Sequence, residues 1–102
     1  MTAIVVDAEF ELLSPEGGGR SAPVMSGYTP NHRFDPESYY IGIIEYGDDG
    51  WHRPGTKRTV RIRFMPSPGL KERLIPGYQW DVTEGGHVIG HAKAVRVLGE
   101  MD

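Results

Sequence analysis

Histidine, serine and acidic side chains are the first places to look for chemistry in this chain, because they supply metal ligands, nucleophiles and proton-transfer groups. His87 and His91 are four residues apart. On a strand, at about 3.3 Å per residue, that spacing puts both rings on one face but about 13 Å apart, too far to share one metal ion. His32 and His52 lie in separate segments, and the chain has no cysteine. The sequence therefore predicts no metal site and no cofactor.

The serines form no recognisable catalytic pattern. Ser14, Ser21 and Ser26 could each be paired with a histidine, but none stands in a Gly-x-Ser-x-Gly nucleophile elbow. No Gly-rich phosphate loop ending in Lys-Ser or Lys-Thr occurs either, so the sequence predicts that this chain binds no GTP. We expect a protein that is not an enzyme.

Basic side chains offer a different chemistry, which is phosphate binding. Lys57 and Arg58 precede an alternating segment that carries Arg61 and Arg63 on its outer side. This basic stripe could bind a nucleic-acid backbone, with Tyr39, Tyr40 or Trp51 as a stacking surface. The alternative is that these arginines pair with carboxylates on neighbouring strands. A formal net charge of −3 argues against a strongly electrostatic nucleic-acid binder.

The elements that would position these residues are short strands. Residues 4–13 alternate, with Val6, Ala8, Phe10 and Leu12 on one face. The acidic residues between them are then a solvated strand face rather than a catalytic set, and Asp48-Asp49 is an acidic turn. Further strands are predicted to start at 23–25 and to cover 39–46, 59–65, 79–83 and 87–98. The last of these loses its alternation near Ala94, which indicates a β-bulge, and residues 70–74 fit one helical turn or an irregular crossing.

Length and composition bound the fold class. With 102 residues, including 14 glycines and 8 prolines, the chain fits one all-β domain over residues 1–102. The core spans about residues 4–98, with short tails at both ends. About six short strands joined by Gly/Pro turns are typical of a small closed barrel or sandwich. Without cysteine, a signal-like segment or an apolar run of about 18 residues, we expect a soluble cytoplasmic protein with no membrane partner.

Several glycine motifs occur in a specific order along the chain. A Leu13-Ser14 strand end precedes the Gly18-Gly19-Arg20 loop, and Ser26-Gly27-Tyr28 with Pro30 follows. The Arg53-Pro54-Gly55 turn comes next, and then Glu84-Gly85-Gly86 with Gly90. In this order and spacing, from about Ala8 to Leu98, the chain resembles the C-terminal β-barrel domain of translation elongation factor Tu, without the GTPase domain. The resemblance implies a six-stranded antiparallel Greek-key barrel.

The resemblance also implies a function by binding rather than by catalysis. In that family the barrel packs against the GTPase domain, helps to hold the T-stem of aminoacyl-tRNA and contacts the nucleotide-exchange factor. By position, Arg20 matches a phosphate-contacting arginine, and Glu84 and Gly85 match residues near the tRNA backbone. His87 stands where the family has an arginine. The implied role is a non-catalytic module that contacts tRNA or a translation component through these residues.

A protein-interaction module with a changed partner, such as a decoy or accessory subunit that binds no RNA, is the alternative. The segment after Pro30 departs from the aromatic-rich run of the family, which makes it a candidate contact. This hypothesis assigns protein contact to Tyr28, Asn31, His32, Arg33, Phe34 and Trp51. The RNA hypothesis requires the basic side chains to converge on one face, whereas the protein hypothesis requires an exposed apolar patch near Trp51 or Tyr28.

Overall fold

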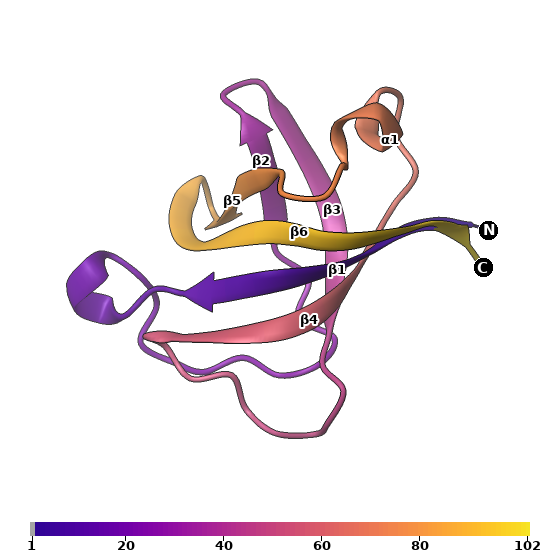
Figure 1. The fold of residues 1–102 in the computed structure, drawn as a ribbon. Helices are drawn as coiled ribbons and strands as arrows, with labels where there is room; N and C mark the ends of the chain where they lie inside the picture. Colours follow the sequence, from indigo (N-terminus) through magenta and orange to yellow (C-terminus); the bar gives the residue numbers. More distant parts are fainter. Residues whose placement is uncertain (1) are drawn as a thin grey trace.

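A computed structural model describes residues 2–102. These residues form six strands and two short helical segments (Figure 1). The strands are β1 Ala3–Leu12, β2 Asn31–Asp35, β3 Ser38–Glu45, β4 Thr56–Phe64, β5 Gln79–Glu84 and β6 His87–Met101. The helical segments are the 3₁₀ helix η1 (Pro15–Gly17) and the α-helix α1 (Leu70–Arg73). Within residues 2–102, no helix has the length and apolar character needed to span a bilayer.

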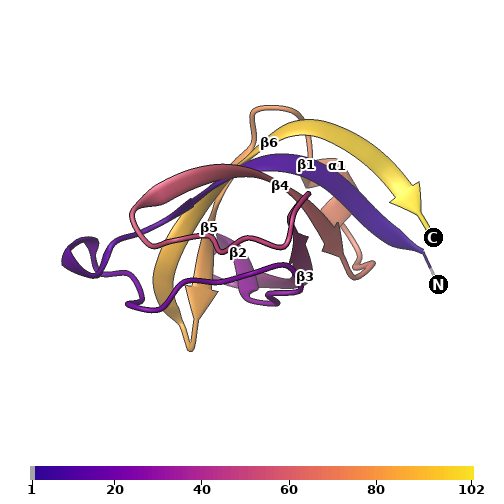
Figure 2. The same ribbon diagram turned by 90° about the horizontal axis from the view of Figure 1, so that it is seen from below.

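The strands close into a barrel in the order β1-β4-β3-β2-β5-β6, and every neighbouring pair is antiparallel. Strands β2, β3 and β4 follow one another, and β1 lies beside β4 after a long connection, which is a Greek-key arrangement. Figure 2 shows β1, β4 and β6 arching over β2, β3 and β5. Both termini lie side by side because Ala3 pairs with Met101. The predicted six-stranded antiparallel barrel is confirmed.

Alternating side chains of β1 and β4 form a large part of the barrel core. Val6, Ala8, Phe10 and Leu12 are completely buried, as the alternation of β1 predicts. The inward residues of β4 are equally buried, and the two strands pair along nine positions. The other four strands complete the core, with Phe34, Ile44, Trp80 and Ile89 among their buried side chains.

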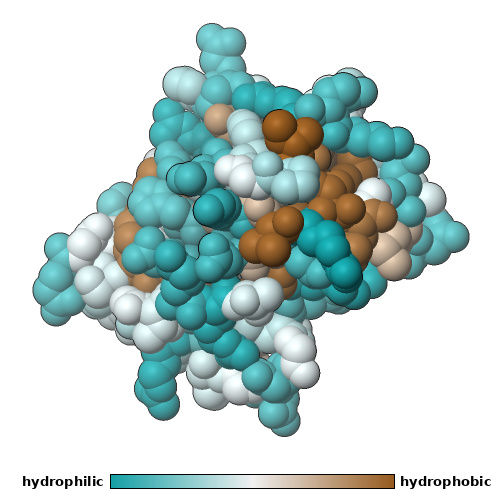
Figure 3. Space-filling model, viewed as in Figure 1, coloured by the Kyte–Doolittle hydropathy of each residue, from teal (hydrophilic) through white to brown (hydrophobic). Residues whose placement is uncertain are grey.

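Strand β6 carries the predicted bulge, and a second one beyond it. Ala94 pairs with Ala8 and Arg96 with Asp7, so Val95 has no partner of its own in β1. The side chain of Val95 is 52% exposed. Figure 3 shows apolar surface over β6 and beside α1. Val95 and Met101 are exposed large hydrophobic residues of β6, and Ile75 is one in the segment that follows α1. The bulge thus turns apolar side chains of a core strand outward.

The second strand differs from the prediction. It covers residues 31–35, whereas Val24 forms only an isolated bridge with His52. Strand β2 does alternate, with His32 and Phe34 facing inward. Because the inward residue His32 is polar, the sequence of this strand shows no apolar alternation.

Candidate binding surfaces

Arg20, Tyr28 and Glu84 form one polar network at the end of the barrel where β5 turns into β6. The Arg20 guanidinium lies 3.0 Å from Glu84 Oε2, and the Tyr28 hydroxyl donates a hydrogen bond to the same oxygen. The Arg20 guanidinium also lies 5.4 Å from the centre of the Tyr28 ring. Burial, together with the Glu84 carboxylate, raises the pKa of Tyr28, so the hydroxyl stays protonated and remains a donor.

Glycines shape the loop that delivers Arg20. Gly18 ends η1 with φ of +90°, a conformation that costs glycine little. A Cβ atom on Gly19 would lie 2.1 Å from the Leu13 carbonyl oxygen, so the chain can pass there only without a side chain. His87, just after the β5–β6 turn, donates through Nε2 to the Gly18 carbonyl.

The candidate RNA-facing residues therefore come together at one end of the barrel. Gly85 and Gly86, both at positive φ, form the turn between Glu84 and His87. The charge of Arg20 is already balanced there by Glu84. A phosphate would have to displace that carboxylate before it could use the arginine.

Each of the three arginines of the basic stripe is paired with a carboxylate. Arg58 lies 2.7 Å from Asp48, Arg61 lies 2.9 Å from Asp7, and Arg63 lies 2.8 Å from Glu45. The Arg61 guanidinium, through its hydrogen bonds, holds the pKa of Asp7 below its usual value, so both partners stay charged. Lys57 pairs in register with Glu11, and no ion pair links the two side chains. The arginines of the stripe thus follow the alternative reading, in which they pair with carboxylates.

Trp51 is the most exposed aromatic side chain among the described residues, at 56%, and Met25 beside it is 41% exposed. They line a shallow hollow of about 360 Å³ together with Arg20, Pro23 and Tyr28. The two loops that carry Met25 and Trp51 are joined by a pair of backbone hydrogen bonds, 3.0 and 2.7 Å long, between Val24 and His52. We refer to the Met25 and Trp51 side chains as the Trp51 patch.

His32 and Phe34 lie inside the barrel and cannot contact a partner from there. His32 is completely buried, and Phe34 is only 9% exposed within an aromatic cluster that includes Phe64 and Trp80. The interpretation of these two side chains as contact residues is therefore corrected, because both belong to the core. In the same strand, the Asn31 side chain is exposed and that of Arg33 is half-buried.

The hydrogen bonds of His32 fix its neutral form. Trp80 Nε1–H donates to His32 Nδ1 over 3.0 Å, so Nδ1 has no proton, and Nε2–H donates to the Gly42 carbonyl over 3.1 Å. Burial lowers the pKa of His32 to about 4. The buried histidine is thus a structural polar group whose partners come from two other strands.

His52 is also completely buried and hydrogen-bonded through both ring nitrogens. Its Nε2–H donates to the Thr56 carbonyl over 2.9 Å, and its Nδ1 accepts from the Tyr46 hydroxyl over 2.6 Å. Burial lowers the pKa of His52 as well. Within residues 2–102, no three His, Cys, Asp or Glu side chains are grouped so that they could hold a metal ion.

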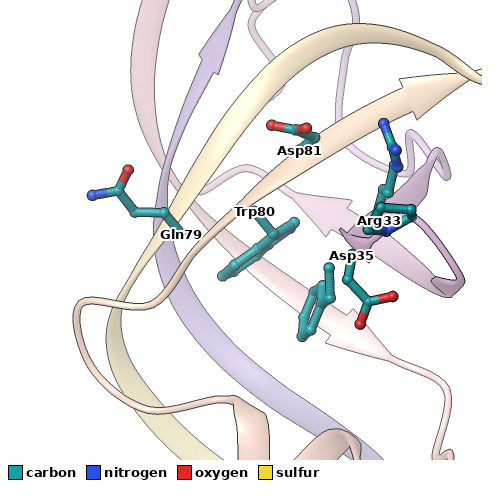
Figure 4. A pocket seen from close by; sticks show the side chains of 7 residues that line it. Arg33, Asp35, Gln79, Trp80 and Asp81 are labelled. Carbon is teal, nitrogen blue, oxygen red and sulfur yellow. The ribbon is translucent and has the colours of Figure 1, made fainter.

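A second hollow of about 290 Å³ lies over β2 and β5, lined by Arg33, Asp35, Gln79, Trp80 and Asp81 (Figure 4). Its carboxylates are already occupied, because Asp35 pairs with Arg73 over 2.8 Å and Asp81 pairs with His91 over 3.0 Å. Arg33 points away from Asp35 in Figure 4 and makes no ion pair with the residues described. Its Nε atom is buried without a hydrogen-bond partner.

Comparison with known proteins gives matches to part of one translation factor. No protein-family model matches the chain. The chain is 31% identical over 83 residues to elongation factor Tu 2 of Streptomyces avermitilis, which covers 81% of the chain and 20% of that protein. It is 30% identical over 89 residues to the chloroplastic elongation factor Tu of Chaetosphaeridium globosum, covering 82% of the chain and 21% of that protein. The chain therefore spans about a fifth of the length of the curated relatives it matches.

Proposed function

Since the chain is homologous to about a fifth of elongation factor Tu, we propose that it is a non-catalytic binding module acting in translation in the cytoplasm. We further propose that it works by docking a protein partner through the Trp51 patch. A large aromatic side chain beside a flexible methionine suits this role, because such residues bury much apolar area at an interface.

The observation that carries the proposal is the contrast between the charged and apolar surfaces. Arg20, Arg58, Arg61 and Arg63 each have a carboxylate partner within 3.0 Å. Binding a phosphate with any of them would leave a carboxylate next to the phosphate or break an existing pair. Trp51 meets no such obstacle, because more than half of its side-chain surface is open to solvent.

An affinity capture from lysate, with and without RNase and at two salt concentrations, tests the proposal. We expect a protein that survives RNase treatment, binds at both salt concentrations and is lost with Trp51→Ala. Ile75→Ala is the matched control, because Ile75 is equally exposed, at 58%, but belongs to the connection between α1 and β5. Retention of the same partner by Trp51→Ala would remove the Trp51 patch from the interface.

Binding of tRNA through Arg20, Glu84, Gly85 and His87 is the second candidate, favoured by the convergence of these residues at one end of the barrel. It predicts that bound tRNA disappears as salt is raised. It also predicts that Arg20→Ala weakens tRNA binding, because Arg20 would supply the phosphate contact after leaving its ion pair with Glu84. Capture of a protein partner without tRNA, by the wild type and by the Arg20 variant alike, would decide for the first candidate.

A further inference from the structure

The outer face of β3 is apolar, unlike the outer faces of the strands beside it. Tyr39, Ile41 and Ile43 occupy successive outward positions and are 47%, 49% and 39% exposed. The outward positions of β2 carry the polar residues Asn31, Arg33 and Asp35, and those of β4 include Arg61 and Arg63. An exposed sheet face of a soluble protein normally alternates apolar-in with polar-out.

Met65 widens this apolar row. Its backbone N–H donates to the Ile41 carbonyl over 3.0 Å, which sets the two residues side by side on adjacent chain segments. Met65 is 50% exposed. We call Tyr39, Ile41, Ile43 and Met65 the β3 stripe. Apolar residues gathered in this way on a surface mark an interaction site.

The two ends of the β3 stripe carry opposite charges. Arg33 lies across from Tyr39 in the β2–β3 register and makes no ion pair with the described residues. Glu45 is the next outward residue of β3 after Ile43, with a side chain 41% exposed. Arg63 hydrogen-bonds Oε1 of Glu45, and no hydrogen bond within residues 2–102 uses Oε2. The stripe therefore runs from a cation without a partner to a carboxylate with an open oxygen.

We propose that the β3 stripe is a homodimer interface, in which a second copy of this chain packs its own β3 stripe across a two-fold axis at Gly42. A two-fold axis there places Ile41 of one copy over Ile43 of the other. It also brings Tyr39, with its neighbour Arg33, over Glu45 of the second copy. Such an isologous contact must be complementary to itself, and a stripe with opposite charges at its two ends meets that condition.

The small area of the β3 stripe limits the affinity of this dimer. Tyr39 and Glu45 are six residues apart, about 20 Å along the strand, and packed sheets lie about 10 Å apart. Four apolar side chains on a barrel wall cover less than the roughly 800 Å² per partner that a standard interface buries. The dimer is therefore weak and depends on concentration.

Sedimentation equilibrium of the purified chain, from about 10 µM to about 1 mM, tests the proposal. The expected result is a monomer–dimer equilibrium that Ile41→Thr weakens by at least about tenfold. Val95→Thr is the matched control, because Val95 is 52% exposed on β6 and lies outside the stripe. A monomer at every concentration, or a dimer that is indifferent to Ile41→Thr, would overturn the proposal.

Exchanging the charges of Arg33 and Glu45 tests whether these two residues contact each other across the dimer, apart from any nonspecific effect of a surface substitution. Arg33→Glu and Glu45→Arg should each weaken the dimer, and the double variant should restore it. Because the two positions are about 20 Å apart within one chain, restoration reports a contact between copies. Failure of the double variant to recover, with circular dichroism showing an intact fold, would contradict the two-fold arrangement. Trp51→Ala should leave the dimer unchanged, which separates this interface from the proposed function.

Discussion

Acid should destabilise this barrel well above the pH at which its carboxylates titrate, and His32 is the main reason. Protonation of its Nδ1 would point a second proton at the Trp80 Nε1–H, so two donors would face each other across 3.0 Å. Burial lowers the pKa of His32 from 6.5 to about 4. In the unfolded chain the ring takes up its proton near pH 6.5, so the unfolded state binds more protons between these values.

The sign and magnitude follow from that difference. Stability is complete above about pH 6.5, falls as the pH decreases, and stops changing through this group below about pH 4. At about 1.4 kcal/mol per pKa unit, His32 costs about 1 kcal/mol by pH 5.5 and about 3 kcal/mol by pH 4. His52, whose pKa is also lowered, adds to the loss in the same direction. Small domains have only about 5–15 kcal/mol of stability, so this loss is large.

Urea unfolding at a series of pH values, followed by circular dichroism, measures the effect. His32→Gln should be less stable at neutral pH but should lose less stability than the wild type as the pH falls from 6.5 to 4. His91→Gln is the control, because the exposed His91 pairs only with Asp81 at the surface, and it should keep the wild-type slope. The reasoning is refuted if His32→Gln and the wild type have the same pH slope in this range. It is also refuted if the imidazole signals show His32 protonated in the folded protein at pH 6.

Two further predictions concern the same core and the Arg20 loop. Trp80→Phe removes the donor that faces His32 Nδ1, so we expect the pKa of His32 to rise toward its usual value. The buried Nδ1, left without a hydrogen-bond partner, should lower the free energy of unfolding by about 1–3 kcal/mol. An unchanged titration of His32 would contradict this prediction. Gly19→Ala should lower the urea midpoint more than Gly18→Ala, because its Cβ would lie 2.1 Å from the backbone oxygen of Leu13, whereas at Gly18 only the positive φ, worth about 1 kcal/mol, opposes a side chain. Equal losses in the two glycine variants would show that the loop moves to relieve the clash.

The sequence predicted the parts of the barrel that depend on local alternation. From Val6 to Leu12 of β1 the apolar and acidic residues alternate without interruption, so the inward face of this part followed from the pattern alone. In β2 the inward position of His32 depends on Trp80, which is 48 residues away, and on the Gly42 carbonyl. A polar side chain becomes a core residue only when distant partners satisfy it, and a local pattern does not reveal them.

In the candidate site too, the sequence predicted local features but not the contacts between distant residues. The family resemblance placed Arg20 and Glu84 at one end of the barrel, but their ion pair joins residues 64 positions apart. Likewise, the pairing of Arg61 with Asp7 requires that β1 lie next to β4, which the order of strands along the chain does not give. The exposure of Trp51 was predictable because it lies on a short connector between two turns. That connector is too short to form a strand that would turn the side chain into the core.

The distribution of charge decides what kind of binding energy this surface can supply. Four of the basic side chains that could hold a phosphate already have carboxylates, so new ionic contacts there would mostly replace existing ones. The exposed apolar side chains, in contrast, include those of the Trp51 patch and of the β3 stripe, and Ile75, Val95 and Met101. Burial of apolar area gains about 25 cal/mol per Å² and depends little on salt. Binding through the Trp51 patch should therefore persist as salt is raised, whereas self-association should weaken modestly because it adds the exposed pairing of Arg33 with Glu45.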